Sequence, residues 1–478
     1  MKQPVDWPDE QFFEVPTKDF SSDGGTTSSG PLWHAVSTRW GHAMHALCSY
    51  QGMYPPKLVH YFLQRYSEPG QTVLDPFGGR GTTTLQAKVE QRVAIGNDLS
   101  PLAYILGRAK AAPPSWPEVM RYIDRLEECY SSAPRTQPEV SDDIRMLYRD
   151  ETLDQLWFLR SRLLETDLMS WNALDSMVAA GIAGILHGAT REDGTSSYLS
   201  ISMPNTFSMS PAYVRRYIAE NGLEPPEQNV FDRLRDKLAM QYLDANTGPD
   251  SVIFNGDAGQ VMRSDHVAEK ADLIITSPPY LKVVNYGTSN WIRLWWLGID
   301  DVSTQAGAGR RDLDSKLDHA HGYAKYEDFM LNIFKGACRA LTPDGVAVFV
   351  IGDVASSGRD TLPLAQTVWD RVGSQSGLRL LDFIEDDLPA QKKVSRIWGE
   401  TKGQATNRDC ILVLSRTDGS PSVVRPETDW SEPYRDAGPD AAHAHVRRRR
   451  QDMRDVLKTA RVVPGRKRNQ SLESPGSV

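Results

Sequence analysis

The chain has 478 residues, of which 40% are hydrophobic and 24% are charged, and its formal net charge is −8. This composition is typical of a globular protein with about two to four domains, or of one elaborated α/β domain with additions. The negative charge argues against a uniformly basic nucleic-acid-binding coat, and no apolar run reaches the roughly 18–20 residues of a membrane span.

The first residues contain no apolar stretch typical of an export signal, so we expect a cytoplasmic protein. The four cysteines are widely spaced and form no CxxC pair: Cys48, Cys129, Cys338 and Cys410. This spacing predicts neither a disulfide framework nor a zinc module. His42 and His45 have a spacing that would suit a metal, but no third ligand is evident, so we predict no metal site.

Residues 1–35 are polar, include the run SSDGGTTSSG, and are expected to form a flexible lead-in. Residues 36–111 are predicted to form the first part of an α/β domain. A helix is expected around Leu58–Leu63, a buried strand at "TVLDPF", a glycine-rich turn and helix at "GGRGTTTLQAKVE", and a second strand at "RVAIGNDL". Strand, turn, helix and strand in this order form a βαβ unit.

Residues 112–250 differ in character from the segment before them. Prolines mark the beginning of this stretch, and apolar residues between Leu153 and Leu164 recur at helical spacing. This spacing predicts a mainly helical segment. The stretch is far longer than an ordinary connecting loop, so we predict that it forms an insert.

The alternating pattern resumes in residues 251–427, with strands expected at "SVIFNGDA", "ADLIITSPPY", "GVAVFVIGD" and "DCILVLSR". Strands separated by helices predict an α/β fold with a doubly wound, mostly parallel sheet. Residues 428–478 are expected to form a basic, disordered tail. Its cluster Arg447–Arg450 suits either a salt-sensitive DNA tether or a soluble terminus.

The first chemical motif is "DPFGGRGTT", from Asp75 to Thr83, with Asp98 twenty residues after Gly78. Glycines at a strand-to-helix turn let the backbone approach a ligand, and an acid at the end of the next strand accepts hydrogen bonds from ribose hydroxyls. The motif therefore predicts a nucleoside cofactor. Asp75 would repel a pyrophosphate but suits a cationic cofactor with a free α-amino group, such as S-adenosylmethionine (AdoMet).

The second motif is "TSPPY", from Thr276 to Tyr280, at the carboxyl end of a predicted strand. Two prolines remove two backbone donors and fix two φ angles, so they form a rigid corner where doubly wound folds bind ligands. The Ser277 hydroxyl and a backbone carbonyl offer acceptors there, and Tyr280 offers a flat face. This arrangement suits a planar base with an exocyclic amino group, whereas a plain turn is the alternative.

Together the two motifs resemble those of the amino-group DNA methyltransferases of the class I AdoMet-dependent fold. "DPFGGRGTT" is similar to their cofactor motif DPFxGxGTT, with Arg80 where a small residue is more common. "TSPPY" is similar to their catalytic motif [DNS]PP[YFW], whose Ser form is typical of cytosine-N4 enzymes. The resemblance covers about residues 54–111 and 251–416 and implies a seven-stranded sheet.

The resemblance implies methyl transfer from AdoMet to N4 of cytosine in double-stranded DNA, within a restriction-modification or phage-defence system whose nuclease is a candidate partner. Three alternatives stay open: an adenine-N6 DNA enzyme, an RNA guanine-N2 enzyme and a non-catalytic, AdoMet-responsive DNA-binding subunit. The resemblance assigns catalysis to Ser277, Pro278, Pro279 and Tyr280. It assigns cofactor contacts to ten residues: Tyr54, Pro55, Asp75, Pro76, Phe77, Gly78, Gly81, Thr82, Asp98 and Asp257.

DNA contacts are expected from the loop that follows the proline corner, through Lys282, Tyr286 and Asn290, and from Arg215 and Arg216 in the insert. The cofactor motif precedes the catalytic motif here, which is the reverse of many enzymes with the Ser form, so the position of the target-recognition region is not carried over from them. The insert, residues 112–250, is the candidate for that region, and a helical cap that supports the sheet is the alternative.

Overall fold

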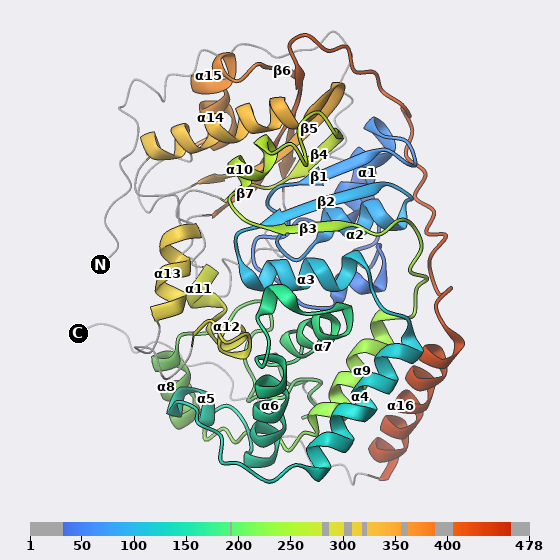
Figure 1. Ribbon diagram of the computed structural model, residues 1–478, viewed down its shortest axis with the longest axis vertical. Helices are drawn as coiled ribbons and strands as arrows, with labels where there is room; N and C mark the ends of the chain where they lie inside the picture. Colours follow the sequence, from blue (N-terminus) through green and yellow to red (C-terminus); the bar gives the residue numbers. More distant parts are fainter. Residues whose placement is uncertain are drawn as a thin grey trace, which may run out of the picture.

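The computed structural model describes residues 32–191, 194–279, 286–300, 308–317, 323–354, 362–387 and 405–459. At its centre lies a seven-stranded sheet in the order β3-β2-β1-β4-β5-β7-β6 (Figure 1). The strands are β1 (Thr72–Asp75), β2 (Val93–Asp98), β3 (Val252–Asn255), β4 (Ala271–Thr276), β5 (Leu341–Val354), β6 (Leu378–Asp387) and β7 (Ala405–Arg416). All neighbours run parallel except β7, which is antiparallel to β5 and β6. This confirms the predicted α/β fold with a mostly parallel, seven-stranded sheet.

The central strands are apolar because both faces of the sheet are covered by helices. Successive side chains point to opposite faces, so Val73 of β1 packs into one cluster and Leu74 into the other. Leu273 and Ile274 of β4 divide in the same way. The first face is covered by α1 (Pro56–Tyr66), and the second by α10 (Ala258–Arg263), α14 (Tyr323–Ala340) and α15 (Leu364–Val372).

A helical region lies below α3 (Pro101–Ala111) in Figure 1. It contains α4 (Trp116–Ser132), α5 (Asp142–Arg145), α6 (Asp150–Leu163), α7 (Ala173–Ala183), α8 (Pro211–Asn221) and α9 (Val230–Gln241). Its core also takes in α12 (Trp291–Trp296), where Trp295 and Trp296 are 2% and 1% exposed. The tryptophans of α12 therefore tie the chain after the proline corner to the insert.

The prediction of a disordered tail is wrong for residues 428–459. The structure describes these residues, and they end in α16 (Asp440–Thr459). Tyr434 is buried, and the buried carboxylate of Asp244 accepts hydrogen bonds from the backbone N–H groups of Asp436 (2.8 Å) and Ala43 (2.7 Å). This segment crosses the N-terminal part of the chain and then packs α16 along α9. The segment alternates polar and buried residues, so its composition did not indicate these contacts. Residues 460–478 lie outside the described residues.

The lead-in also ends earlier than expected. Residues Leu32–Ala35 form a 3-10 helix in which Trp33 is 1% exposed, and its indole N–H donates to Asp386 at 3.1 Å. A buried tryptophan anchors this turn to β6.

His42 and His45 are both buried in the described structure. His42 Nε2 lies 3.1 Å from the carbonyl oxygen of Ala245, and His45 Nε2 lies 2.9 Å from Oε1 of Gln86. Burial lowers the pKa of His42 to about 4. Within the described residues no group of three or more potential ligands is arranged for a metal ion, and no helix is both long and apolar enough to span a bilayer.

Candidate active site

The glycine-rich turn joins β1 to α2 (Thr82–Val89) at the carboxyl edge of the sheet. Gly79 and Gly81 have φ values of +50° and +76°, which side chains with a Cβ rarely adopt. The Gly78 N–H donates to the carbonyl of Asn97 at 2.8 Å, and a Cβ on Gly78 would lie 3.3 Å from that oxygen. The glycines therefore let the turn lie directly against the end of β2.

Asp98 ends β2 and faces this turn. Its Oδ2 accepts the Gly79 N–H and its Oδ1 accepts the Ser100 N–H, both at 2.8 Å. Burial raises the pKa of Asp98 to about 6, and the hydrogen bonds from the backbone oppose that rise. Each carboxylate oxygen keeps acceptor capacity beyond these bonds, which suits two hydroxyl groups of a ligand.

Asp75 lies beneath the turn and is 1% exposed. Its Oδ1 accepts the Thr276 hydroxyl at 2.7 Å, and its Oδ2 accepts the Tyr54 hydroxyl at 3.1 Å. Burial raises the pKa of Asp75 to about 6, and these hydrogen bonds oppose the rise. The structure therefore places this carboxylate as a brace between β1 and β4, and not at the surface of the pocket where a direct cofactor contact was expected.

The proline corner follows β4, the parallel neighbour of β1, so both loops leave the same edge of the sheet. Ser277 and Pro279 line one pocket with the glycine turn, whereas Pro278 is buried behind them. The carbonyl of Ile275 accepts the Thr83 hydroxyl at 3.2 Å, which ties the corner to α2. Tyr280 and Lys282, predicted for catalysis and DNA contact, lie outside the described residues.

The pocket encloses about 810 Å³, including the solvent at its mouth. Seven of the ten predicted cofactor residues line it: Tyr54, Pro76, Phe77, Gly78, Thr82, Asp98 and Asp257. Pro55 instead is the N-cap residue of α1, Gly81 packs its backbone near Gly107, and Asp75 lies beneath the turn. Asp257 also caps α10 by accepting the Gln260 N–H at 2.9 Å.

An aromatic wall completes the pocket, and the sequence analysis missed half of it. Tyr50 stacks on Tyr286 with ring centroids 6.1 Å apart and an angle of 27° between the planes. Burial and the nearby Asp98 raise the pKa of Tyr286, so both phenols stay neutral at physiological pH. Tyr286 was expected to contact DNA, but it lies in the wall beside Asp98.

Asn290 is 2% exposed, which contradicts the expected DNA contact. Its Nδ2 donates to the carbonyl of Tyr286 at 2.9 Å, and its Oδ1 accepts from Nη1 of Arg293 at 3.0 Å. Asn290 therefore holds the wall in position from behind. Asn290 is buried because the short helix α11 (Tyr286–Ser289) turns this part of the loop inward.

Arg215 and Arg216 lie on α8, on the exposed side of the insert. Arg215 forms an ion pair with Asp143, and Arg216 lies 3.7 Å from Glu220. They do not line the pocket, and DNA contact through them stays a prediction.

Arg80, the departure from the usual motif, clamps the turn to the preceding loop. Its Nη1 donates to the carbonyl of His45 at 3.1 Å, and its own carbonyl accepts from Nζ of Lys110 at 2.6 Å. Burial lowers the pKa of Arg80 to about 10, so the guanidinium remains charged at neutral pH. The turn thus contains a cation whose donors are directed at a backbone carbonyl and at the Thr82 hydroxyl.

Two further groups of lining residues were missed. Gln51, Gly52 and Met53 directly precede the predicted segment that begins at Tyr54, so a wider window around "YPPK" would have included them. Phe329 reaches the pocket from α14 and meets Phe77 edge-on at 6.0 Å. Nothing in an amphipathic helix distinguishes such a residue from an ordinary core residue.

Comparison with known proteins gives one family match and several distant relatives. Residues 22–105 match a family model described as DNA methylase, N6_N4_Mtase. The chain is 37% identical over 67 residues to the type II methyltransferase M.MjaII of Methanocaldococcus jannaschii. That match covers 14% of this chain and 13% of that protein. It is 22% identical over 280 residues to the type II methyltransferase M.MvaI of Kocuria varians. That match covers 56% of this chain and 60% of that protein.

Among solved structures, TrmN from Thermus thermophilus is 10% identical, with 78% of this chain and 51% of that chain covered and a TM-score of 0.28. That score adds nothing to the fold established by the sheet itself. The matches span about an eighth and three fifths of the two curated relatives. The family match covers the glycine turn and the end of β2, where the pocket geometry is built. Residues 22–105 thus match the N6/N4 amino-group DNA methylase family, and the chain shows distant homology to the type II methyltransferases M.MjaII and M.MvaI.

Proposed function

We propose that the chain transfers a methyl group from AdoMet to the exocyclic N4 of cytosine in duplex DNA. One observation carries the proposal: a single pocket is lined both by the glycine turn with Asp98 and by Ser277 and Pro279 of the proline corner. Methyl transfer requires that the donor and the acceptor meet at near-attack distance, and a shared pocket is the simplest way to bring them together.

The residues of the pocket fit AdoMet. The carboxylate of Asp98 is held by two backbone N–H groups and suits the two ribose hydroxyls. Gly78 allows close approach of the backbone, and Tyr50 and Tyr286 offer aromatic faces to the adenine. Asp98 and Asp257 give the lining an acidic character that suits a cation, while the donors of Arg80 point to a backbone carbonyl and to Thr82. When bound, AdoMet supplies an electrophilic methyl group on a sulfonium.

On the acceptor side, the Ser277 hydroxyl and the Pro278 carbonyl are proposed to accept hydrogen bonds from the amino group of cytosine. The lone pair of that nitrogen is delocalised into the ring, so acceptors that draw it toward sp3 geometry make it a better nucleophile. The fixed φ angles of Pro278 and Pro279 hold both acceptors in place. The base must leave the duplex to reach them, which costs a few kcal/mol, and stacking on Tyr280 is proposed to offset part of that cost.

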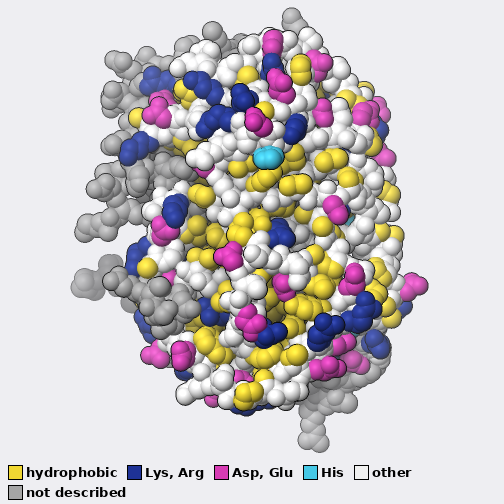
Figure 2. All heavy atoms as spheres, viewed as in Figure 1, with side chains coloured by type: hydrophobic (Ala, Val, Ile, Leu, Met, Phe, Trp, Pro, Cys, Tyr) yellow, Lys and Arg dark blue, Asp and Glu magenta, His cyan; other side chains and the backbone are white. Residues whose placement is uncertain are grey.

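The choice of cytosine over adenine rests on Ser277, since the Ser form of the motif is typical of N4 enzymes. The insert, residues 112–250, is proposed as the target-recognition region, with a nuclease of a type II restriction system as a candidate partner. Figure 2 shows Lys and Arg interspersed with Asp and Glu on the face drawn there. A mixed surface of this kind favours a local DNA contact over a broad basic face.

The proposal is tested by incubating the protein with AdoMet and unmodified genomic DNA, digesting to nucleosides and identifying the product by mass. N4-methyl-2′-deoxycytidine is expected. N6-methyl-2′-deoxyadenosine would replace the N4 assignment with the adenine alternative. A parallel reaction with cellular RNA covers the guanine-N2 alternative, and methylation of RNA alone would overturn the choice of DNA. The absence of any transfer by protein that binds AdoMet and DNA would favour the non-catalytic alternative.

A further inference from the structure

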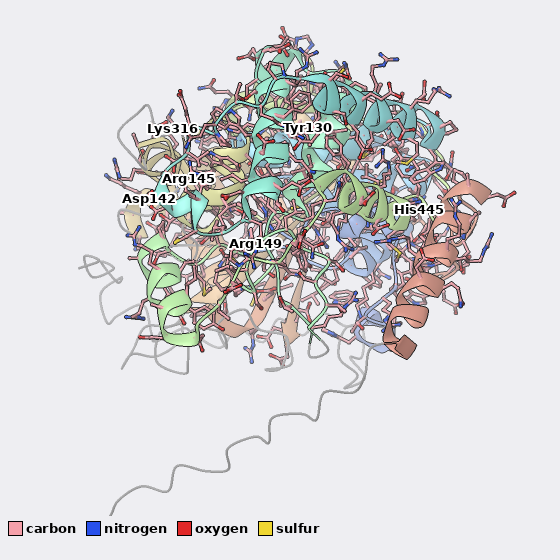
Figure 3. All side chains as sticks on the ribbon, turned by 90° about the horizontal axis from the view of Figure 1, so that it is seen from below. Tyr130, Asp142, Arg145, Arg149, Lys316 and His445 are labelled. Atoms are coloured by element: carbon pink, nitrogen blue, oxygen red, sulfur yellow. The ribbon has the colours of Figure 1, made fainter. Side chains whose placement is uncertain are left out.

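A second pocket lies between α9 and α16, bounded also by the chain that follows α7. We call it the α9–α16 pocket. It encloses about 1,210 Å³, including the solvent at its mouth. Figures 1 and 3 place α16 on the side of the molecule opposite α13 (Ala308–Leu317), and Figure 3 marks these two sides by the labels His445 and Lys316. The pocket shares no lining residue with the candidate active site.

The lining of the α9–α16 pocket is strongly cationic. Among the described lining residues, the only carboxylate is Asp236, against four arginines and one lysine: Arg191, Arg233, Arg449, Arg450 and Lys237. Such an imbalance concentrates positive potential in a cleft and favours an anionic ligand.

Asp236 cannot neutralise this charge because two arginines and a histidine already share it. Its oxygens lie 2.9 Å from His445 Nε2, 2.8 Å from Arg449 Nη2 and 3.4 Å from Arg233 Nη1. The acid one turn earlier, Asp232, lies 3.6 Å from Arg235. These contacts dock α16 on α9 and leave a surplus of positive charge.

Two arginines of the α9–α16 pocket have no carboxylate partner among the described residues, namely Arg191 and Arg450. Within the described part of the chain, the guanidinium of Arg191 makes only long hydrogen bonds to hydroxyls of its own loop, at 3.5 Å to Thr195 and 3.4 Å to Ser197. Both side chains belong to exposed residues at the edge of the pocket. Planar guanidinium groups that are exposed and have no described carboxylate partner suit phosphate oxygens, which accept paired hydrogen bonds.

The rest of the lining suits a larger group than phosphate. Met240 is 41% exposed, and the half-buried ring of Tyr198 adds an aromatic surface. Gln241 also lines the pocket and is 3% exposed, yet its Oε1 has no hydrogen-bond partner in the described part of the chain. A buried amide oxygen without a donor is uncommon.

We propose that the α9–α16 pocket binds a nucleotide. Its phosphates would lie on Arg191 and Arg450, and its base on Tyr198 and Met240. A free nucleotide and a nucleotide unit of a nucleic acid share this chemistry. The inference stands apart from the proposed methyl transfer, because it uses none of the residues of the candidate active site.

The test is isothermal titration of the full chain with ATP, with excess S-adenosylhomocysteine present so that the adenosine group cannot report on the first pocket. Parallel titrations use inorganic phosphate, a short single-stranded oligonucleotide and a duplex. The test variant is R191Q/R450Q, which removes two charges that pair with no described carboxylate. The matched control is R447Q/R448Q, which removes two charges from exposed positions of α16 outside the pocket.

We expect ATP to bind and R191Q/R450Q to weaken that binding by about tenfold or more, while R447Q/R448Q leaves it near the unaltered value. If an oligonucleotide binds, ATP does not, and only R191Q/R450Q weakens the oligonucleotide, the nucleotide belongs to a nucleic acid. Inorganic phosphate binding as tightly as ATP would overturn the nucleoside part. Equal effects of the two double variants, or no binding of any probe, would overturn the site. Thermal unfolding curves of both variants verify that each remains folded.

Discussion

The hydroxyl of Thr276 donates a 2.7 Å hydrogen bond to Oδ1 of Asp75, and both residues are buried. This bond joins the ends of β4 and β1, directly beneath the two loops that form the candidate active site. Asp75 therefore links the glycine turn to the proline corner from below. A carboxylate in this position is costly to ionise, and the cost makes its role measurable.

Asp75→Asn is expected to flatten the pH dependence of stability. Burial raises the pKa of Asp75 from 3.8 to about 6, so between these values the folded chain binds more protons than the unfolded chain. Stability from this group is therefore full below pH 4 and falls as pH rises through 6, by about 3 kcal/mol in all. The asparagine variant, which can still accept the Thr276 bond, should lack this fall. Denaturant unfolding at pH 4, 5.5 and 7 measures the difference.

The matched control for this experiment is Asp265→Asn, because the Asp265 side chain is fully exposed. It should leave the difference in unfolding free energy between pH 4 and pH 7 unchanged. If the unfolding free energies of Asp75→Asn and of the unaltered protein had the same pH dependence, Asp75 would not be a buried, proton-binding group.

Ser277→Ala is expected to slow methyl transfer about 100- to 1,000-fold while AdoMet affinity is retained. The hydroxyl is proposed to stabilise charge that develops in the transition state, and removal of one such group commonly has an effect of this size. Single-turnover methylation and calorimetric AdoMet binding separate the two effects. Ser131→Ala is the control, because Ser131 is exposed on α4 and its hydroxyl only meets the Glu127 carbonyl of the same helix. Equal rates for both variants would remove Ser277 from the mechanism.

Tyr286→Ala is expected to weaken AdoMet binding by about 2- to 10-fold, whereas Tyr286→Phe should bind normally. The reason is loss of the aromatic wall with Tyr50, since stacked aromatic pairs contribute about 0.5–1.5 kcal/mol beyond burial. Tyr213→Ala is a suitable control, because Tyr213 stacks on Tyr217 at 6.1 Å in α8, outside the pocket. A phenylalanine variant as weak as the alanine variant would assign the effect to the hydroxyl and contradict the stacking role.

The parts of the fold that sequence could predict are those specified by neighbouring residues. Apolar strands, the glycines between β1 and α2 and the acid that ends β2 follow from local patterns, and the structure contains them. The parts that sequence could not predict depend on distant contacts. The Asp75 carboxylate turns toward Thr276, 201 residues away, and Tyr50 meets Tyr286 across the pocket. No local pattern records which of two acids faces a ligand and which is buried.

The chain after residue 428 was misinterpreted for the same reason, and this leads to the last prediction. Deletion of residues 428–478 removes the buried side chains of Tyr434 and Val446, each of which contributes roughly 1.5–3 kcal/mol by leaving water. It also leaves the buried Asp244 without the backbone donor of Asp436 and the guanidinium of Arg435, which lies 3.3 Å away. We therefore expect a large fall in the thermal unfolding midpoint. Deletion of residues 460–478 alone retains all of these contacts and serves as the matched control. Equal midpoints for the two deletions would mean that residues 428–459 contribute nothing to stability, whereas a lower midpoint for the longer deletion alone would establish them as part of the folded core.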